Sequence, residues 1–360
     1  MRHRHFESLQ PVCPVCRIAS SQDWPLRLAD VAREQDGHIV EGVLHCSNER
    51  CRREFPILDG IPLIVANLRQ YVSDNVLAID GRRDLSELAE SLLGDCCGPS
   101  STFDQLRQQL SFYAWDHYAD LDPREADDDV QPGSMLRCLQ AGRQLAEPIP
   151  PGPILDVGCS VGRGSLALAE RAADLVLGID LNFAMLRLAS EVLRTGRVCY
   201  PRRRVGLVYD RREFPARFAN AENVDFWACD AAALPFPAGT FSLAVSMNVL
   251  DCAATPADLL TSVARVLRGG GKLVLTCPYD WSPAATPLEA WLGGHSQRSP
   301  SAGASETVLR ALLTPGAHPA ASGDLQLVAE QEHLPWHVRL HARSTMRYSV
   351  HLVVARVVRV

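Results

Sequence analysis

The residues best suited to chemistry lie in and after a glycine-rich stretch in the middle of the chain. Residues 154–157, apolar except for Asp156, lead into Gly158–Gly164, which holds three glycines. Glycines lack a Cβ atom, so the backbone there can approach a ligand closely or turn with a positive φ. Asp180 follows 24 residues after Asp156, close to the spacing at which a carboxylate accepts hydrogen bonds from both ribose hydroxyls. These residue types together predict a site for a nucleoside-containing ligand.

Alternating strand and helix patterns surround this stretch and position it. The segments with strand patterns are 154–157, 175–179, 224–228, 242–248, 267–277, 325–331 and 348–357. The segments with helical patterns are 140–146, 165–171 and 183–193. Strands that alternate with helices are typical of a doubly wound sheet, in which ligands bind at the carboxyl ends of the strands. The sequence therefore predicts an α/β, Rossmann-like domain.

The glycine spacing separates two kinds of nucleotide-binding enzyme. It reads G-x-x-x-G-x-G rather than the G-x-G-x-x-G of dinucleotide-binding enzymes. Asp156–Gly164 resembles the D-x-G-x-G-x-G motif of the class I S-adenosylmethionine (SAM) methyltransferases, with Ser160 at the middle glycine. Leu234–Phe241 and Leu267–Cys277 also resemble segments of that family. The resemblance implies a seven-stranded class I methyltransferase domain, with an antiparallel last strand and SAM as its cofactor.

The same resemblance assigns individual residues to the cofactor. In the family, the acid that follows the third strand contacts the adenine amino group, and Asp230 holds that position, with the backbone N–H of Ala231 reaching a ring nitrogen. The residues assigned to SAM are Asp156, Gly158, Cys159, Ser160, Gly162, Asp180, Leu181, Asp230, Ala231 and Asn248.

Four cysteines near the N-terminus have the spacing of metal ligands. Cys13 and Cys16 form a C-x2-C pair, and Cys46 and Cys51 form a C-x4-C pair, with enough chain between the pairs for a β-hairpin. Four thiolates suit tetrahedral Zn2+ in a closed structural site. Because so small a module has little core, zinc would supply much of its folding free energy. The alternative is four unrelated free cysteines.

The segment after the second pair narrows this interpretation. Cys51–Leu63 reads C-R-R-E-F-P-I-L-D-G-I-P-L, which resembles the ending of short zinc-ribbon proteins that activate tRNA, rRNA and protein methyltransferases. The resemblance covers residues 10–68. In that family the ribbon supports a methyltransferase partner. Here the resemblance implies that the partner follows in the same chain.

A second resemblance concerns the methyltransferase region. Gly158–Ser165, the segment Thr276–Trp281 with Trp291–Gly294, and Pro335–Arg339 are similar to the methyltransferase domain of ovothiol-biosynthesis enzymes, over residues 112–358. That domain methylates a ring nitrogen of a thiolated histidine. The sulfoxide synthase module of those enzymes is absent and a zinc ribbon stands in its place. The fold and cofactor therefore carry over better than the acceptor, which we expect to be a small polar molecule.

Four residues are candidates for work on the acceptor. Asn248 and Tyr279 are predicted to orient a polar acceptor group. If a general base is needed, His117 and Tyr279 are the first candidates, although an imidazole or thiolate acceptor requires none. Arg339, with Arg343 as the alternative, is a candidate to pair a substrate carboxylate in a bidentate fork. The aromatic segment 112–118 is either a lid over the substrate or a helix packed on the core. For each of these residues, the alternative is a structural role in which its polar group is hydrogen-bonded within the protein.

Two other functions remain open. The arginines at 202–204 and 211–212 lie in a long insertion, where they either bind RNA phosphates or pair with nearby acids. Binding to phosphates would suit an RNA methyltransferase, or one acting on protein, that uses the zinc ribbon for recognition. Ser160 and Gly269 depart from the methyltransferase consensus and are the hints of a non-catalytic scaffold.

Composition sets wider limits. The chain has 360 residues, a net charge of −6 and 47% hydrophobic residues, so it has no overall attraction for nucleic acid. No apolar run approaches the roughly 20 residues of a membrane span. The first residues lack the apolar segment of a signal peptide, which predicts a cytoplasmic protein. We expect a zinc ribbon at 8–68, a helical linker and lid at 69–135, and the methyltransferase domain at 136–360. Within the linker, the sequence Cys96-Cys97-Gly98-Pro99 predicts a loop, and the acidic, proline-containing segment 122–133 predicts another. The sequence does not fix the oligomeric state.

Overall fold

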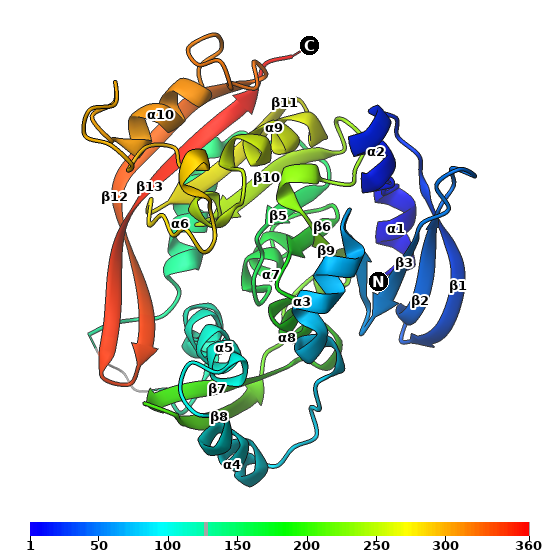
Figure 1. Ribbon diagram of the computed structural model, residues 1–360, viewed down its shortest axis with the longest axis vertical. Helices are drawn as coiled ribbons and strands as arrows, with labels where there is room; N and C mark the ends of the chain where they lie inside the picture. The colour runs from blue at the N-terminus through cyan, green and yellow to red at the C-terminus, as the bar shows by residue number, and fades with distance from the viewer. Residues whose placement is uncertain (126–128, 360) are drawn as a thin grey trace.

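The computed structural model describes residues 1–125 and 129–359 (Figure 1). Its strands are β1 (Leu26–Gln35), β2 (His38–Cys46), β3 (Glu54–Leu58), β4 (Ile61–Ile64), β5 (Ile154–Val157), β6 (Val176–Asp180), β7 (Arg197–Val205), β8 (Val208–Pro215), β9 (Val224–Cys229), β10 (Phe241–Met247), β11 (Leu267–Cys277), β12 (Leu325–His341) and β13 (Ser344–Val357). Its α-helices are α1 (His3–Leu9), α2 (Pro14–Ser20), α3 (Leu68–Asp80), α4 (Glu87–Cys97), α5 (Thr102–Tyr118), α6 (Ser134–Ala146), α7 (Arg163–Ala169), α8 (Phe183–Thr195), α9 (Pro256–Val266) and α10 (Ser305–Leu312).

Seven strands form the central sheet in the order β9-β6-β5-β10-β11-β13-β12. Strands β5, β6, β9, β10 and β11 run parallel to one another. Strand β13 lies antiparallel between β11 and β12. Every position of β5 and β9 is buried, as expected for parallel strands with helices on both faces. The predicted Rossmann-like fold, including its antiparallel last strand, is confirmed.

Helices cover both faces of this sheet. Leu260 of α9 packs in the core on one face, and Leu139 of α6 and Leu188 of α8 pack in the core on the other. Two of these helices begin at residues that favour a helix N-terminus. The Asn182 side chain caps α8, and Pro256 occupies the first turn of α9. Within the described residues, no helix is both long and apolar enough to cross a membrane.

The N-terminal strands extend the same sheet. Strands β1 and β2 form the hairpin expected between the two cysteine pairs. Strand β4 pairs in parallel with β9, with Leu63 opposite Ala228 and Ile64 opposite Cys229. The sheet therefore has 11 strands, and its hydrogen bonds join the ribbon region to the strands that follow. The domain boundary expected after residue 68 stays a prediction.

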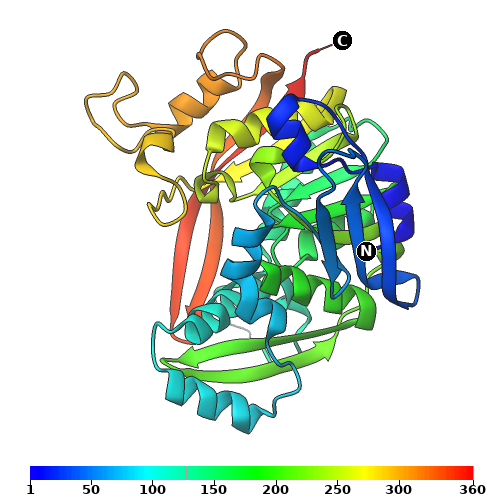
Figure 2. The same ribbon diagram turned by 45° about the vertical axis from the view of Figure 1, so that its right-hand side comes forward.

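A separate layer lies beside the central sheet. Helices α4 and α5 pack with the hairpin β7–β8, and the far end of the long hairpin β12–β13 reaches the same layer (Figure 2). The hairpin β7–β8 is the arginine-rich insertion. The expectation of a loop around Cys96 and Cys97 is wrong, because α4 continues through both until Gly98, at φ +75°, closes its last turn onto Gly94. The acidic loop expected at 122–133 includes residues 126–128, which lie outside the described residues.

Candidate functional site

The glycine turn after β5 has the geometry that its sequence predicts. Gly158, Ser160 and Gly162 all have positive φ, at +71°, +51° and +89°. A Cβ atom on Gly158 would collide with Val249, and one on Gly162 would lie 2.6 Å from the Phe226 ring. Glycine is therefore required at 158 and 162 both by the turn and by close packing.

Asp180, at the carboxyl end of β6, is bound to this turn. The backbone N–H of Ser160 donates to its Oδ2 over 2.9 Å, and that of Asn182 donates to its Oδ1 over 2.8 Å. Burial raises the pKa of Asp180, against these hydrogen bonds. Cys159 is buried under the turn, whereas Leu181 is 46% exposed beside Asp180. The structure therefore brings the Asp180 carboxylate next to the glycine turn.

Asp156 is placed differently from the other predicted cofactor residues. Its side chain is buried in β5, and Ser165 Oγ donates to its Oδ2 over 2.7 Å. Burial raises the pKa of Asp156 to about 7, and nearby Asp180 adds to the rise. The Asp156 carboxyl group thus holds the first turn of α7 through its hydrogen bond with Ser165. Its direct contact with a cofactor stays a prediction.

Asp230, Ala231 and Asn248 follow the next strands at the same edge. Asp230 Oδ1 accepts from the N–H of Ala232 over 2.9 Å and so caps the short 3-10 turn that begins at Ala231. Asn248 has φ +56°, and its Oδ1 accepts from Thr276 Oγ1 over 2.8 Å. Because β9, β6, β5 and β10 are neighbours in the sheet, the predicted cofactor residues lie along one continuous edge.

His117 and Arg339 lie on the helix and hairpin that flank this edge. His117 is buried in α5, and burial, with Arg163 nearby, lowers the pKa of His117 to about 3. A histidine with so low a pKa is a weak base at neutral pH. The Arg339 guanidinium lies 5.1 Å from the Trp115 ring centroid, and its Nη2 donates to the Val130 carbonyl. The roles predicted for His117 as a general base and for Arg339 as a partner of a substrate carboxylate stay predictions.

The Tyr279 hydroxyl is part of a hydrogen-bonded chain. It lies 2.7 Å from His351 Nδ1, and His351 Nε2 lies 3.1 Å from Glu330 Oε2. Arg310 pairs with Glu330 over 2.8 Å and with Glu332 over 2.6 Å. The Tyr279 hydroxyl therefore has partners on β13 and β12, and its predicted contact with an acceptor stays a prediction.

A second group of polar residues at this edge was not among the predicted site residues. Tyr348 Oη donates to Asp280 Oδ2 over 2.8 Å, and the Asp280 N–H donates to Asp251 Oδ2 over 2.7 Å. The Tyr113 side chain is 43% exposed, but the protein atoms around its hydroxyl raise its pKa, and Cys252, Asp180 and Asp251 raise it further. The position of both acids just after β10 and β11 was the available sequence signal, whereas Tyr348 lies inside a strand.

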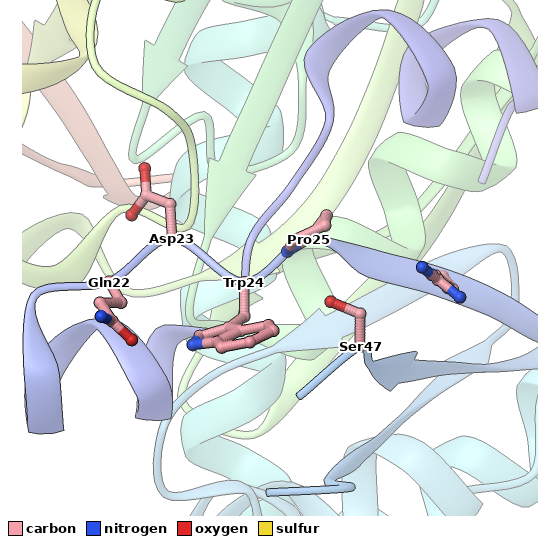
Figure 3. A pocket seen from close by; sticks show the side chains of 6 residues that line it. Gln22, Asp23, Trp24, Pro25 and Ser47 are labelled. Carbon is pink, nitrogen blue, oxygen red and sulfur yellow. The ribbon is translucent and has the colours of Figure 1, made fainter. Parts of the chain in front are cut away.

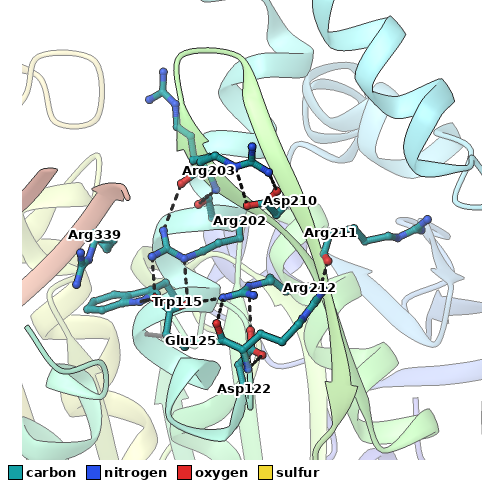
Figure 4. A network of polar contacts seen from close by, with 12 residues as sticks. Trp115, Asp122, Glu125, Arg202, Arg203, Asp210, Arg211, Arg212 and Arg339 are labelled. Carbon is teal, nitrogen blue, oxygen red and sulfur yellow. Dashed lines mark hydrogen bonds and ion pairs between the residues drawn. The ribbon is translucent and has the colours of Figure 1, made fainter. Parts of the chain in front are cut away.

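The arginines of the insertion are engaged within the chain (Figure 4). The Glu125 carboxylate accepts from Arg202 over 2.8 and 3.2 Å, from Arg212 over 3.0 Å and from the Trp115 indole over 3.0 Å. Arg212 Nε lies 3.0 Å from Asp122 Oδ2. Burial acts to raise the pKa of Glu125, but the hydrogen bonds from Arg202, Arg212 and Trp115 outweigh it and hold the pKa below its usual value.

The other arginines of the hairpin are also paired. Arg204 pairs with Asp210, Arg211 lies 3.8 Å from Glu90, and Arg203 donates to a carbonyl of its own hairpin. Four of the five arginines at 202–204 and 211–212 therefore pair with acids, which was one of the two predictions for them. Among the described residues of this hairpin, these arginines do not form a row of free cations for RNA phosphates.

The four predicted zinc ligands converge. The sulfur atoms of Cys13, Cys16, Cys46 and Cys51 all lie within 4.8 Å of one another, and the first three residues are buried. The Asn48 backbone N–H lies 3.4 Å from Cys46 Sγ, and its side-chain amide lies 3.5 Å from Cys16 Sγ. Convergent sulfurs supported by N–H donors fit a tetrahedral thiolate site.

A surface hollow of about 490 Å3 lies on the ribbon (Figure 3). It is lined by Gln22, Asp23, Trp24, Pro25, Arg27 and Ser47. It is a broad, open depression away from the carboxyl ends of the central strands. We therefore locate the candidate cofactor site by the glycine turn and Asp180 rather than by the size of a hollow.

Comparison with known proteins identifies the kind of domain that holds these residues. Residues 155–275 match a family model described as a methyltransferase domain, so the predicted kind of domain is confirmed. A 2-methyl-6-phytyl-1,4-hydroquinone methyltransferase of Synechocystis sp. is 28% identical in an alignment of 234 residues that covers 61% of this chain and 59% of the relative. An uncharacterized chloroplastic methyltransferase of Arabidopsis thaliana, At2g41040, is 26% identical over 134 residues, 37% of this chain and 33% of the relative.

The chain therefore spans less than two thirds of either curated relative. Among solved structures, a SAM-dependent methyltransferase from Methanosarcina mazei is 21% identical and covers 58% of this chain and 93% of its own, with a TM-score of 0.38. The narrower resemblances, to zinc-ribbon activators and to ovothiol enzymes, stay predictions.

Proposed function

We propose that this chain is a SAM-dependent methyltransferase. The observation that carries the proposal is the carboxylate of Asp180, held by the N–H of Ser160 in the glycine turn at the carboxyl edge of the sheet. It lies in the segment that matches the methyltransferase-domain model. A nucleoside ribose would place its hydroxyls on this carboxylate.

The remaining cofactor residues take their roles from their places along the edge. Gly158 and Gly162 let the backbone approach the cofactor, and Asp230 with Ala231 receives the adenine. SAM supplies a methyl group on a sulfonium. The chain's part is to hold acceptor and methyl group in line, because positioning alone accounts for much of the rate of such a displacement.

For the acceptor we propose a small polar molecule, with an imidazole nitrogen of a histidine-derived metabolite as the specific candidate. The W-L-G-G block and the late arginine of the ovothiol-like pattern support it. RNA is less favoured as an acceptor, because the arginines of the insertion pair with acids of the chain. Labelled SAM offered with thiolated histidine, and separately with total RNA and protein, tests the choice by where the label appears. Absence of methylated thiolated histidine at saturation would remove the imidazole candidate.

We also propose that the four cysteines hold a structural Zn2+. All four positions of a tetrahedral site are then thiolates, so no coordination position is left for a substrate. The ribbon contacts the catalytic region directly: the Val12 N–H donates to the Pro235 carbonyl over 2.9 Å, and β4 pairs with β9. Zinc would thereby stabilise the edge of the sheet next to the adenine side of the site.

The proposed function is tested by binding of S-adenosylhomocysteine, measured by calorimetry. The wild-type chain should bind it, and Asp180→Asn should weaken binding by at least about tenfold, because a charged hydrogen-bond acceptor for the ribose is lost. Asp174→Asn is the matched control, since Asp174 lies just before the opposite end of the same strand. Unchanged affinity in folded Asp180→Asn, or no binding by the wild-type chain, would contradict the proposal.

A further inference from the structure

The polar group opposite Asp180 is arranged to receive an acceptor, an inference that rests on the proposed function. Strands β11 and β13 are antiparallel, with Cys277 opposite His351. Three residues beyond this pair on each strand, Asp280 and Tyr348 meet in a hydrogen bond of 2.8 Å. Asp251, which is buried, accepts from the Asp280 N–H over 2.7 Å. Tyr348 therefore holds the Asp280 side chain and Asp251 holds its backbone, while Asp280 remains exposed.

Two further residues lie close to this group: Tyr113 on α5, and Cys252, which directly follows Asp251. Tyr113 of α5 is 43% exposed, and its main electrostatic neighbours are Cys252, Asp180 and Asp251. Cys252 is exposed, yet the protein atoms around its thiol raise its pKa to about 12, with further increases from Asp251, Asp280 and Asp180. Three carboxylates from the ends of β6, β10 and β11 thus lie along the carboxyl edge of the sheet near Tyr113.

The movement of charge during methyl transfer explains how these carboxylates would act on the acceptor. The C–S bond of the sulfonium breaks, sulfur keeps the electron pair, and the lone pair of the acceptor forms the new bond to the methyl carbon. When the acceptor is a neutral nitrogen, the positive charge moves from sulfur to that nitrogen. Fixed carboxylates beside the acceptor stabilise charge that develops there. They repel an anionic acceptor such as a phenolate or a phosphate.

We propose that Asp280, held in place by Tyr348, binds a nitrogen-bearing, hydrogen-donating or cationic group of the acceptor beneath Tyr113. The substrate class is thereby an amine or an imidazole rather than an anionic oxygen acceptor. Asp251 acts through Asp280 as a positioning residue, since its buried carboxylate fixes the Asp280 backbone.

Two probes with the same ring test this proposal: histamine, with a cationic tail, and imidazole-4-acetate, with an anionic one. Each is titrated by calorimetry into wild-type protein, both saturated with S-adenosylhomocysteine and free of it. We expect the wild-type chain to prefer histamine by at least about tenfold, because one charged hydrogen bond is gained with the first probe and one repulsion is added with the second.

Asp280→Asn should reduce this preference to about twofold or less, and Tyr348→Phe should reduce it by about threefold through loss of the orienting hydrogen bond. Both variants should keep the wild-type affinity for S-adenosylhomocysteine. Tyr209→Phe is the matched control, since Tyr209 also donates to an aspartate, Asp104, over 2.8 Å but on the hairpin β7–β8 and α5. It should leave the preference unchanged.

Three results would overturn the inference: equal or tighter binding of imidazole-4-acetate by the wild-type chain, no binding of histamine, or an unchanged preference in Asp280→Asn. Failure of the wild-type chain to bind S-adenosylhomocysteine overturns the proposed function instead. The titrations on cofactor-free protein then still decide whether Asp280 selects a cationic nitrogen compound.

Discussion

Replacing Glu125 with alanine should destabilise the chain strongly. The carboxylate accepts four hydrogen bonds, from Trp115 and from two arginines whose side chains are 8% and 13% exposed. Removal leaves Arg202 without its carboxylate partner, while Arg212 keeps Asp122. Breaking one buried ion pair costs about 3–5 kcal/mol. Because one guanidinium retains a partner, we expect about 3 kcal/mol of lost unfolding free energy.

Urea unfolding followed by circular dichroism measures this loss, as a lower midpoint at an unchanged slope. Glu213→Ala is the matched control, because Glu213 pairs with Arg197 over 2.8 Å but both side chains are about half exposed. An exposed pair contributes about 1 kcal/mol or less. If Glu125→Ala shifts the midpoint no further than Glu213→Ala, the network does not hold the helical layer as we argue.

The pH dependence gives an independent check on the same carboxylate. The pKa of Glu125 is lowered in the folded state, with burial opposing the shift and hydrogen bonds from Arg202 and Arg212 outweighing it. A lowered folded pKa contributes stability that is present above the unfolded pKa and is lost as pH falls through the folded one. The stability difference between wild type and Glu125→Ala should therefore be full at neutral pH and shrink below the usual glutamate range. A constant difference down to strongly acidic pH would refute the argument.

Two further predictions concern the ribbon and the glycine turn. Cys13→Ser should reduce bound zinc, measured by elemental analysis, and lower the melting temperature, whereas Cys97→Ser, at an exposed position, should change neither; equal zinc content in both variants would argue against a metal site. Gly158→Ala should weaken S-adenosylhomocysteine binding by at least about tenfold, because the new Cβ meets Val249 and the φ is positive. Gly206 also has a positive φ, +54°, but open space around it, so equal effects of Gly158→Ala and Gly206→Ala on binding would show that the close contact is unimportant.

The order of strands and helices was accessible from the sequence because each signal is local. The apolar run before Gly158, the acid at 180 and the connector at 234–241 each lie within one element or one turn. Strand boundaries such as β9 and β11 fall within a residue of expectation. The four predicted zinc ligands could also be identified from the sequence, because the spacing of metal ligands can be recognised without knowing the fold. Cys96 and Cys97 were misplaced because their neighbours Gly98 and Pro99 read as a loop signal that in fact begins only after the helix.

The sequence by itself thus determined the class of fold, the glycine turn, the acids that follow the central strands and the four cysteines with metal-ligand spacing. Tertiary structure alone decided that Tyr348 meets Asp280, that Glu125 is surrounded by Arg202 and Arg212, and that β4 continues the central sheet. The physical reason is that these contacts join residues far apart in the chain. Their meeting depends on the register of β11 against β13, the length of the inserted hairpin and the edge left open at β9, which no local pattern of residues encodes.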